Sequence, residues 1–372
     1  MPVLDRILQQ KLALLEEQSA RRQLHDTQRE GVRLLRTGKP LISFACNDYL
    51  GLSQHPEVVE AGRRALAEHG AGAGASRLIS GNHPAYGALE QALAAHYGAQ
   101  AACVFGSGYL ANIGAMAALV GGGDVIVADK LAHACMVDGA KLSGAKLLRF
   151  AHNDLAHAES LLKTHRNAYR HCLIVTEQFF SMDGDRAPLA DLAALASTYD
   201  GWLMIDHAHD LYLPQAWELE ESTIHMGTLS KALGTYGGYI CGSQLLVDFL
   251  KTSARSLMFS TALPPASVAS AHAALRVAAH EPERAHHALA MAELFCTTLG
   301  IAPTGSAIVP VLVGENARAL QLAEALEARG FYVPAIRPPT VPPGTARLRF
   351  SFSAAHTQAQ VEAVASTLKE LL

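Results

Sequence analysis

The chain has 372 residues, of which 50% are hydrophobic and 17% charged, a composition typical of a folded globular protein and unlike that of a disordered chain. Its net charge of −4 argues against a nucleic acid as partner, and no apolar run reaches the roughly 18 residues that span a membrane. A chain of this length exceeds what one hydrophobic core usually organises, so we expect two domains.

The N-terminal residues and the cysteines both favour a soluble, cytoplasmic protein. The first residues are amphipathic and contain an early acid, unlike the apolar core of a signal peptide. The cysteines are scattered without a C-x-x-C pair, and most lie in apolar runs, which indicates buried free thiols in a reducing compartment. They are Cys46, Cys103, Cys135, Cys172, Cys241 and Cys296.

In chain order, the pattern begins with an amphipathic helix over residues 3–24 and a basic, β-like segment at 32–44. From about residue 85, helical patterns alternate with short apolar runs, which predicts an α/β fold with a mostly parallel central sheet and helices on both faces. The predicted strands are 101–105, 124–128, 146–150, 172–177, 202–206, 224–228 and 238–242. The predicted helices between them are 86–97, 110–119, 133–142, 155–163 and 189–197.

The pattern changes after Leu263-Pro-Pro265, where an alanine-rich helix over 267–279 leads into a smaller α/β region. We therefore expect an N-terminal arm over residues 1–44 that packs with the small domain, a large domain over 45–270 and a small C-terminal domain over 271–372.

A lysine in an unusual setting is the strongest functional signal. Lys231 lies in the hydroxyl-rich segment Thr228-Leu-Ser-Lys-Ala-Leu-Gly234, and the apolar run 202–205 upstream ends on Asp206. Pyridoxal phosphate (PLP) needs this pair, because a lysine amine forms a Schiff base with its aldehyde and a carboxylate keeps its pyridine nitrogen protonated. A solvated surface lysine is the ordinary alternative for a single lysine, but the upstream strand and carboxylate favour the PLP site.

Two further turns could complete such a site. Ser107-Gly-Tyr109 lies between a predicted strand and a helix, where backbone N–H groups can hold a phosphate. Thr228 could add a hydroxyl, and Ser230 could either do the same or cap its turn. His133 follows a strand end, where an imidazole could stack on a pyridine ring or simply begin a helix.

Three other patterns leave alternatives open. The sequence Asp206-His-Ala-His-Asp210 could bind a metal, although no third and fourth ligand appear at a characteristic spacing. The glycine-rich loop 71–82 could approach a ligand or a partner subunit, or be a plain connector. The alternating residues Arg347 and Arg349 could bind a carboxylate or form a solvated face.

The chain resembles the α-oxoamine synthases, a group of fold-type-I PLP enzymes, over nearly its whole length. The residues that carry the resemblance are 47–52, 76–81, 106–112, 129–133, 177–185, 206–209 and 228–231. Within the group, residues 150–154 and 335–349 are most similar to the branch that condenses L-alanine with a pimeloyl thioester in biotin biosynthesis. Three departures occur: His207 replaces an acid, residues 210–214 replace a glycine-containing turn, and Tyr86 replaces a histidine.

The resemblance implies a role for each matching position. Lys231 would be the Schiff-base lysine, Asp206 would pair with the ring nitrogen, and His133 would stack on the ring. Other residues would contact the cofactor, the substrates or the phosphate bound in a neighbouring subunit. The phosphate would lie near Ser107, Gly108, Tyr109 and Thr228, the ring hydroxyl near His209 and Ser181, the substrate carboxylate near Asn47 and Arg349, the acyl thioester near Arg21, and the neighbour's phosphate near Thr261.

These roles imply a homodimeric acyltransferase with active sites at the subunit interface. Its substrates would be L-alanine and pimeloyl-CoA or a pimeloyl carrier protein. The alternatives are another amino acid and acyl-CoA pair, as in a glycine C-acetyltransferase, and, more distantly, a metal-dependent hydrolase centred on residues 206–210.

Overall fold

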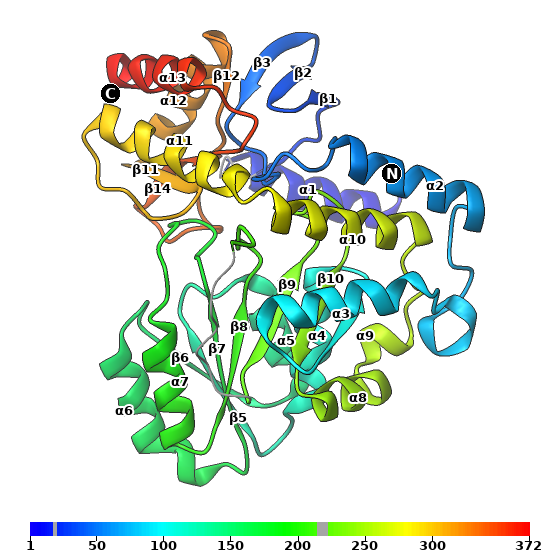
Figure 1. Ribbon diagram of the computed structural model, residues 1–372. Helices are drawn as coiled ribbons and strands as arrows, with labels where there is room; N and C mark the ends of the chain where they lie inside the picture. Colours follow the sequence, from blue (N-terminus) through cyan, green and yellow to red (C-terminus); the bar gives the residue numbers. More distant parts are fainter. Residues whose placement is uncertain (18–20, 214–221) are drawn as a thin grey trace.

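A seven-stranded sheet forms the centre of the molecule in the computed structural model, which describes residues 1–17, 21–213 and 222–372. Figure 1 shows the sheet with helices on both sides. Its strand order is β4-β10-β9-β8-β7-β5-β6, in which only β10 runs antiparallel to its neighbours. The strands are β4 (Ala101–Phe105), β5 (Val125–Asp129), β6 (Lys146–Phe150), β7 (Cys172–Glu177), β8 (Trp202–Asp206), β9 (Ile224–Thr228) and β10 (Gly238–Gly242).

The α/β fold predicted from the alternating pattern is confirmed. Six of the seven predicted strands match the structure residue for residue, including the two that flank Lys231, and β5 is shifted by one residue. Strands β5, β7 and β8 are nearly uninterrupted apolar runs because both faces of the sheet are covered there, so the usual alternation with polar residues is absent.

Alternate residues of each strand pack against different helices. One face packs against α4 (Gly108–Leu119), α5 (Ala134–Ser143), α8 (Gln244–Ser253) and α9 (Arg255–Met258). The other face packs against α6 (Leu155–His165) and α7 (Leu189–Thr198) at one end of the sheet. At its other end, this face packs against α2 (Pro56–His69), α3 (Ala85–Tyr97) and α10 (Pro265–His280). Short turns of π and 3-10 helix lie at Arg77–Gly81 and Arg166–Ala168.

The C-terminal region has its own core, to which the N-terminal strands belong. A three-stranded sheet in the order β11-β14-β13 packs with three helices, and a four-stranded sheet in the order β1-β2-β3-β12 joins residues from both ends of the chain. The strands are β1 (Thr27–Glu30), β2 (Arg33–Arg36), β3 (Lys39–Ser43), β11 (Ile308–Gly314), β12 (Phe331–Tyr332), β13 (Ala335–Ile336) and β14 (Ala346–Ser351). The helices are α11 (Glu283–Leu299), α12 (Asn316–Ala328) and α13 (Gln358–Leu371). The proposed domain boundaries at residues 44 and 270 stay a prediction.

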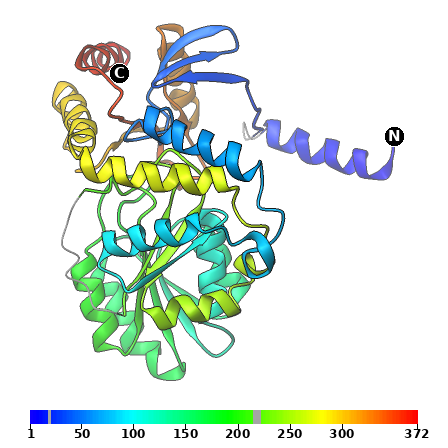
Figure 2. The ribbon, with the colours of Figure 1, turned by 45° about the vertical axis from the view of Figure 1, so that its right-hand side comes forward.

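The N-terminal arm differs from the sequence prediction in two ways. Helix α1 (Val3–Glu17) ends well before residue 24, and residues 21–26 have no regular structure. The predicted segment 32–44 is an antiparallel hairpin of β2 and β3, because Gly38 at positive φ reverses the chain. Helix α1 buries none of its residues and extends away from the body of the molecule (Figure 2). No helix in the described ranges is long and apolar enough to cross a membrane.

Candidate active site

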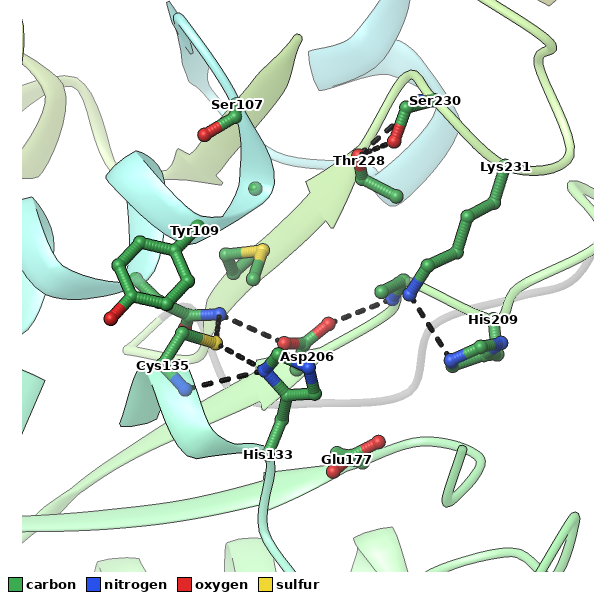
Figure 3. A pocket seen from close by; sticks show the side chains of 14 residues that line it. Ser107, Tyr109, His133, Cys135, Glu177, Asp206, His209, Thr228, Ser230 and Lys231 are labelled. Atoms are coloured by element: carbon green, nitrogen blue, oxygen red, sulfur yellow. Dashed lines mark hydrogen bonds between the residues drawn. The ribbon is translucent and has the colours of Figure 1, made fainter. Parts of the chain in front are cut away.

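A cavity of about 250 Å³ opens where the carboxyl ends of the central strands meet the beginning of α4. Ligands of open α/β sheets bind at this edge, because the strand ends leave a crevice between the connecting loops. Figure 3 shows the side chains that surround the cavity. They are Ser107, Gly108, Tyr109, Asn112, His133, Cys135, Glu177, Asp206, Ala208, His209, Met226, Thr228, Ser230 and Lys231.

One side of the cavity suits an anion. Ser107 caps α4, and its side chain accepts a hydrogen bond from the Leu110 N–H at 3.1 Å, so the helix begins at the cavity wall. The Thr228 and Ser230 hydroxyls lie 2.8 Å apart, and Thr228 adjoins the start of this helix. A Cβ added to Gly108 would approach Thr228 Cβ to 3.2 Å, a tight contact, so the close passage of backbone here favours glycine. The helix N-terminus and the hydroxyls together form a seat for a phosphate.

Asp206 provides a buried carboxylate at the end of β8. It accepts hydrogen bonds from Asn112 Nδ2 at 2.9 Å and from the Ala208 backbone N–H at 2.8 Å. Two donors on a buried carboxylate stabilise its charge and fix its orientation. Asn112 was not among the predicted site residues.

Lys231 follows β9 and extends its amine toward the same space. Burial lowers the pKa of this amine, although the nearby carboxyls of Asp206 and Glu177 oppose the effect. Its Nζ lies 3.1 Å from His209 Nε2. A lysine with a lowered pKa has more of the neutral amine that attacks an aldehyde or removes a proton.

The end of β8 at Asp206 explains how both Asp206 and His209 line the cavity. Residues 207–210 form a turn, so the alternation of side chains along the strand stops there. His207 points elsewhere: its ring nitrogens lie 2.9 Å from Gln178 Oε1 and 3.0 Å from His225 Nδ1. The two imidazoles therefore have different partners, whereas a metal site would need them to converge. No group of three His, Cys, Asp or Glu side chains suited to a metal occurs among the described residues.

Glu177 is a cavity residue that the sequence analysis did not select. Burial and the neighbouring Asp206 raise its pKa well above the ordinary value, while Lys231 and backbone N–H groups act in the opposite direction. Its Oε1 has no hydrogen-bond partner among the described residues. The rule that located Asp206, a polar residue at the carboxyl end of a buried strand, also applies to Glu177 at the end of β7.

His133 begins α5 and faces the cavity beside Cys135. Its Nδ1 lies 2.9 Å from Cys135 Sγ and accepts a longer bond from the Cys135 backbone N–H. Burial lowers the pKa of His133, which favours a neutral ring. Burial also raises the pKa of the Cys135 thiol, so this cysteine is a poor nucleophile.

Three predicted substrate or cofactor residues lie together next to the cavity lining. Arg349 Nε donates to the Ser181 carbonyl at 2.5 Å, and Arg349 Nη1 donates to Asn47 Oδ1 at 3.3 Å. Tyr49 connects this group to the cavity, because its hydroxyl lies 2.7 Å from His209 Nδ1. Arg347, on the same face of β14, instead pairs with Asp183 at 2.5 Å. Both arginines are buried and do not form a solvated face.

Two predicted residues do not join this cluster. Arg21 is exposed and pairs with Glu16 in the last turn of α1. Thr261 forms an isolated antiparallel bridge with Ser76 and does not line the cavity. This bridge ties the glycine-rich loop to the segment before α10.

The departures from the family pattern near His209 form a buried cluster. The Tyr212 hydroxyl donates to the Thr228 carbonyl at 3.1 Å and lies 2.8 Å from the Tyr239 hydroxyl. Tyr212 has a positive φ of 56°, which glycine adopts more easily than tyrosine does. The departure at Pro214 lies outside the described residues. Tyr86, at the third departure, accepts a bond from the Leu263 N–H at 2.8 Å.

The residues of the cavity fit PLP. Its phosphate matches the seat at Ser107, Gly108 and Thr228, its pyridine nitrogen matches the Asp206 carboxylate, and its aldehyde matches the Lys231 amine. The same donor set offers no comparable seat for a dinucleotide, because the turn has no G-x-G-x-x-G pattern.

Comparisons with known proteins agree with this chemistry. A family model described as aminotransferase class I and II matches residues 39–368. The chain is 55% identical to 8-amino-7-oxononanoate synthase of Methylobacterium nodulans, over 100% of this chain and 97% of that protein.

Two solved structures have the same fold. A serine palmitoyltransferase from S. paucimobilis, solved with PLP and myriocin bound, has a TM-score of 0.89 and 29% identity, covering 100% of this chain and 98% of that one. An 8-amino-7-oxononanoate synthase from Francisella tularensis has a TM-score of 0.76 and 25% identity, covering 89% of this chain and 97% of that one. The predicted resemblance to fold-type-I PLP enzymes of the α-oxoamine synthase group is confirmed. The chain belongs to the aminotransferase class I and II family and, within it, to the branch of the 8-amino-7-oxononanoate synthases.

Proposed function

We propose that the chain catalyses the PLP-dependent condensation of L-alanine with a pimeloyl thioester, giving 8-amino-7-oxononanoate and CO2 and releasing CoA or carrier protein, in biotin biosynthesis. The observation that carries this proposal is the 55% identity over the full length of this chain to an 8-amino-7-oxononanoate synthase. The serine palmitoyltransferase relative is similar in fold, but its 29% identity gives weaker support for that activity.

The cofactor supplies an aldehyde for the lysine and an electron-poor ring that stabilises negative charge on the carbon next to the substrate nitrogen. Lys231 holds the cofactor at rest and, once its amine is free and neutral, removes the α-proton of alanine. Asp206, fixed by Asn112 and Ala208, pairs with the ring nitrogen and keeps it protonated. His133 stacks on the ring in its neutral form.

The remaining roles are those that the family resemblance implies. The segment Ser107–Tyr109 and Thr228 hold the phosphate, while His209 and Ser181 lie on the side of the ring hydroxyl. Arg349 and Asn47 hold the alanine carboxylate, which a guanidinium and an amide can bind through several N–H groups. Arg21 contacts the thioester.

We also propose a homodimer located in the cytoplasm. Thr261 does not line the cavity of its own chain, so it is free to reach the phosphate bound by the partner. Helix α1 likewise has an exposed apolar side that a second subunit could cover. The six free cysteines suit a reducing compartment.

The direct test is product identification. Purified protein supplied with PLP, L-alanine and pimeloyl-CoA should form 8-amino-7-oxononanoate, detected by mass spectrometry, and parallel reactions should replace alanine with glycine or serine and pimeloyl-CoA with acetyl-CoA or palmitoyl-CoA. A preference for another pair would assign the chain to a different α-oxoamine synthase activity. Sedimentation of the holoenzyme tests the dimer.

A further inference from the structure

Tyr49 joins the proposed carboxylate clamp to the proposed catalytic lysine. Its side chain is fully buried, and its hydroxyl lies 2.7 Å from His209 Nδ1, while the other ring nitrogen of His209 lies 3.1 Å from Lys231 Nζ. On its other side, the hydroxyl accepts a bond from Arg349 Nη2 at 3.4 Å. A continuous series of polar contacts therefore runs from Arg349 through Tyr49 and His209 to Lys231.

The contacts of the Tyr49 hydroxyl favour one direction for its single proton. Two acceptors are in reach, His209 Nδ1 at 2.7 Å and Asn47 Oδ1 at 3.0 Å. Asn47 Oδ1 already accepts a bond from Arg349 Nη1 at 3.3 Å, whereas His209 Nδ1 has no other donor among the described residues. The shorter contact and the free acceptor both favour donation from Tyr49 to His209.

This direction fixes the tautomer of His209. Burial and the nearby cations Lys231 and Arg349 hold the pKa of His209 well below its ordinary value, so the ring is neutral and carries one N–H. With Nδ1 accepting from Tyr49, that proton is on Nε2, which then faces Lys231 as a donor. Only an amine with a lone pair, the neutral form of lysine, can accept this bond.

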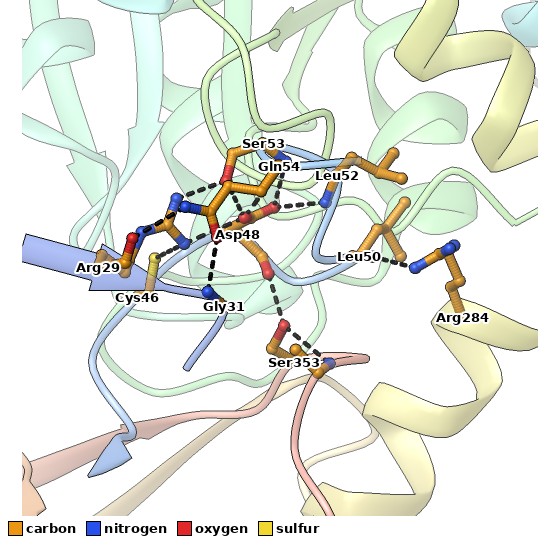
Figure 4. A network of polar contacts seen from close by, with 11 residues as sticks. Arg29, Gly31, Cys46, Asp48, Leu50, Leu52, Ser53, Gln54, Arg284 and Ser353 are labelled. Carbon is orange, nitrogen blue, oxygen red and sulfur yellow. Dashed lines mark hydrogen bonds and ion pairs between the residues drawn. The ribbon is translucent and has the colours of Figure 1, made fainter. Parts of the chain in front are cut away.

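Asp48, the residue before Tyr49, is held by several hydrogen bonds (Figure 4). The Asp48 carboxylate accepts bonds from the Leu52 N–H at 2.9 Å and from Arg29 Nη1 at 3.1 Å. The Asp48 carbonyl accepts a bond from Ser353 Oγ at 2.7 Å. The segment that carries Tyr49 is thus fixed to β1 on one side and to the C-terminal region on the other.

We propose that Tyr49 is a positioning residue for Lys231: through His209, it favours the neutral form of the free lysine amine, which acts as a base once the bond from His209 is released. This inference rests on the proposed function in one respect, since it concerns the stage at which Lys231 is released from the cofactor. It adds a residue that lies outside the cavity lining and contacts neither the cofactor seat nor the reacting carbon.

Charged groups around Lys231 also influence whether its amine is neutral. Asp206 and Glu177 favour the charged amine, while Arg349 disfavours it, and burial favours the neutral form. His133 and Cys135 also line the cavity, one with a lowered pKa and the other with a raised one. Loss of the Tyr49 hydroxyl leaves these groups in place and frees His209 to move its proton to Nδ1. Nε2 can then accept a bond from the charged amine, which favours the ammonium.

The test measures Lys231 directly in the protein without cofactor. Acetylation of Lys231 by a small anhydride is followed by mass spectrometry across a range of pH, because only the neutral amine reacts. In Tyr49→Phe, the midpoint pH for labelling should move upward relative to the wild type, and kcat of the holoenzyme at neutral pH should fall about tenfold, the loss expected for one buried hydrogen bond. The acid limb of the pH profile for kcat should move upward as well.

Two comparisons separate this role from a general loss of packing. Tyr239→Phe removes another fully buried hydroxyl, bonded to Tyr97 and Tyr212, and should leave the midpoint unchanged. In a His209→Asn background, Tyr49→Phe should add no further shift. An unchanged midpoint in Tyr49→Phe, or the same shift with and without His209, overturns the proposal.

If Tyr49→Phe does not fold, a fluorinated tyrosine at position 49 keeps the ring and makes its hydroxyl a stronger donor. The labelling midpoint should then move downward, and an upward or absent shift contradicts the proposal. Because labelling requires no turnover, it gives a result whichever substrates the enzyme uses, whereas failure of the wild type to form 8-amino-7-oxononanoate concerns the proposed function alone.

Discussion

Glu177 and Asp206 are paired in register at the carboxyl ends of the neighbouring parallel strands β7 and β8. Two buried carboxyl groups at such a place cannot both be charged without a large cost. Asp206 has donors on both oxygens, whereas Glu177 Oε1 has no partner among the described residues. The negative charge therefore resides on Asp206, and Glu177 is the neutral member of the pair.

This difference in charge predicts that the enzyme tolerates substitution of Glu177 better than substitution of Asp206. Glu177→Gln replaces a neutral acid with a neutral amide of the same shape and should keep kcat/KM within about threefold of the wild type, because no charge is lost. Asp206→Asn removes the charge that pairs with the ring nitrogen and should lower kcat about 10- to 100-fold, the value of a charged hydrogen bond. Steady-state kinetics on both variants provide the check, and equal losses would contradict the assignment of charge.

Replacement of the proposed Schiff-base lysine should abolish the reaction. Lys231→Ala removes the amine that both binds the cofactor and removes the α-proton, so no 8-amino-7-oxononanoate should form. Lys141→Ala, at an exposed position on α5, is a suitable control and should retain activity. Product formation by purified Lys231→Ala would show that another group performs the chemistry.

The phosphate seat can be tested through its glycine. In Gly108→Ala, the new Cβ lies 3.2 Å from Thr228 Cβ and narrows the seat, so PLP affinity should fall about tenfold or more while the protein still folds. Gly87, in α3, has nothing within 4 Å of an added Cβ. Gly87→Ala should therefore leave PLP binding unchanged and slightly raise stability through helix propensity. Cofactor titration by absorbance and thermal unfolding measure the two effects.

His152 predicts a pH dependence of stability. Burial alone would lower its pKa, but hydrogen bonds to Asp129 and Asp185, at 3.0 and 2.7 Å, raise the pKa to about 10. Because the folded pKa lies above the unfolded value of about 6.5, the contribution of His152 is complete below that pH and is lost as the pH rises through about 10.

Chemical denaturation should show this loss. The difference in unfolding free energy between the wild type and His152→Gln should be largest near pH 6 and should shrink by pH 10. His286→Gln, at an exposed position on α11, should show no such trend. A difference that stays constant or grows with pH would mean that His152 is not charged in its folded setting.

The sequence located those site residues that belong to strand ends and turns. Asp206 and His133 lie at or beyond the ends of apolar strands and Lys231 lies in a hydroxyl-rich turn after β9; the parallel strands bring these ends to one edge, which is why local patterns sufficed. Glu177 follows the same rule and was overlooked because its position is equally consistent with a strand terminus in the core. The fold class was predictable for the same reason, since apolar strands separated by helices have few alternative arrangements.

Other contacts depend on packing between distant segments. Tyr49 and His209 are 160 positions apart in the sequence, and Asn112 and Asp206 are 94 apart, so no local pattern indicates either bond. The overestimated length of α1 has a related cause. None of its residues is buried by the described part of the chain, and a helix without a packed face depends on weak local propensity.

The parallel pairing of β3 with β12 has a consequence for how the protein is made. Residues 39–43 are synthesised early, whereas their partners at 331–332 are synthesised almost last. The hairpin of β2 and β3 therefore leaves the ribosome with the outer edge of β3 unpaired. This edge stays unpaired until β12 has been synthesised. Asp48 and Tyr49 lie shortly after this hairpin, so the contacts of Asp48 with Ser353 and of Tyr49 with Arg349 form only after the C-terminal region has been synthesised.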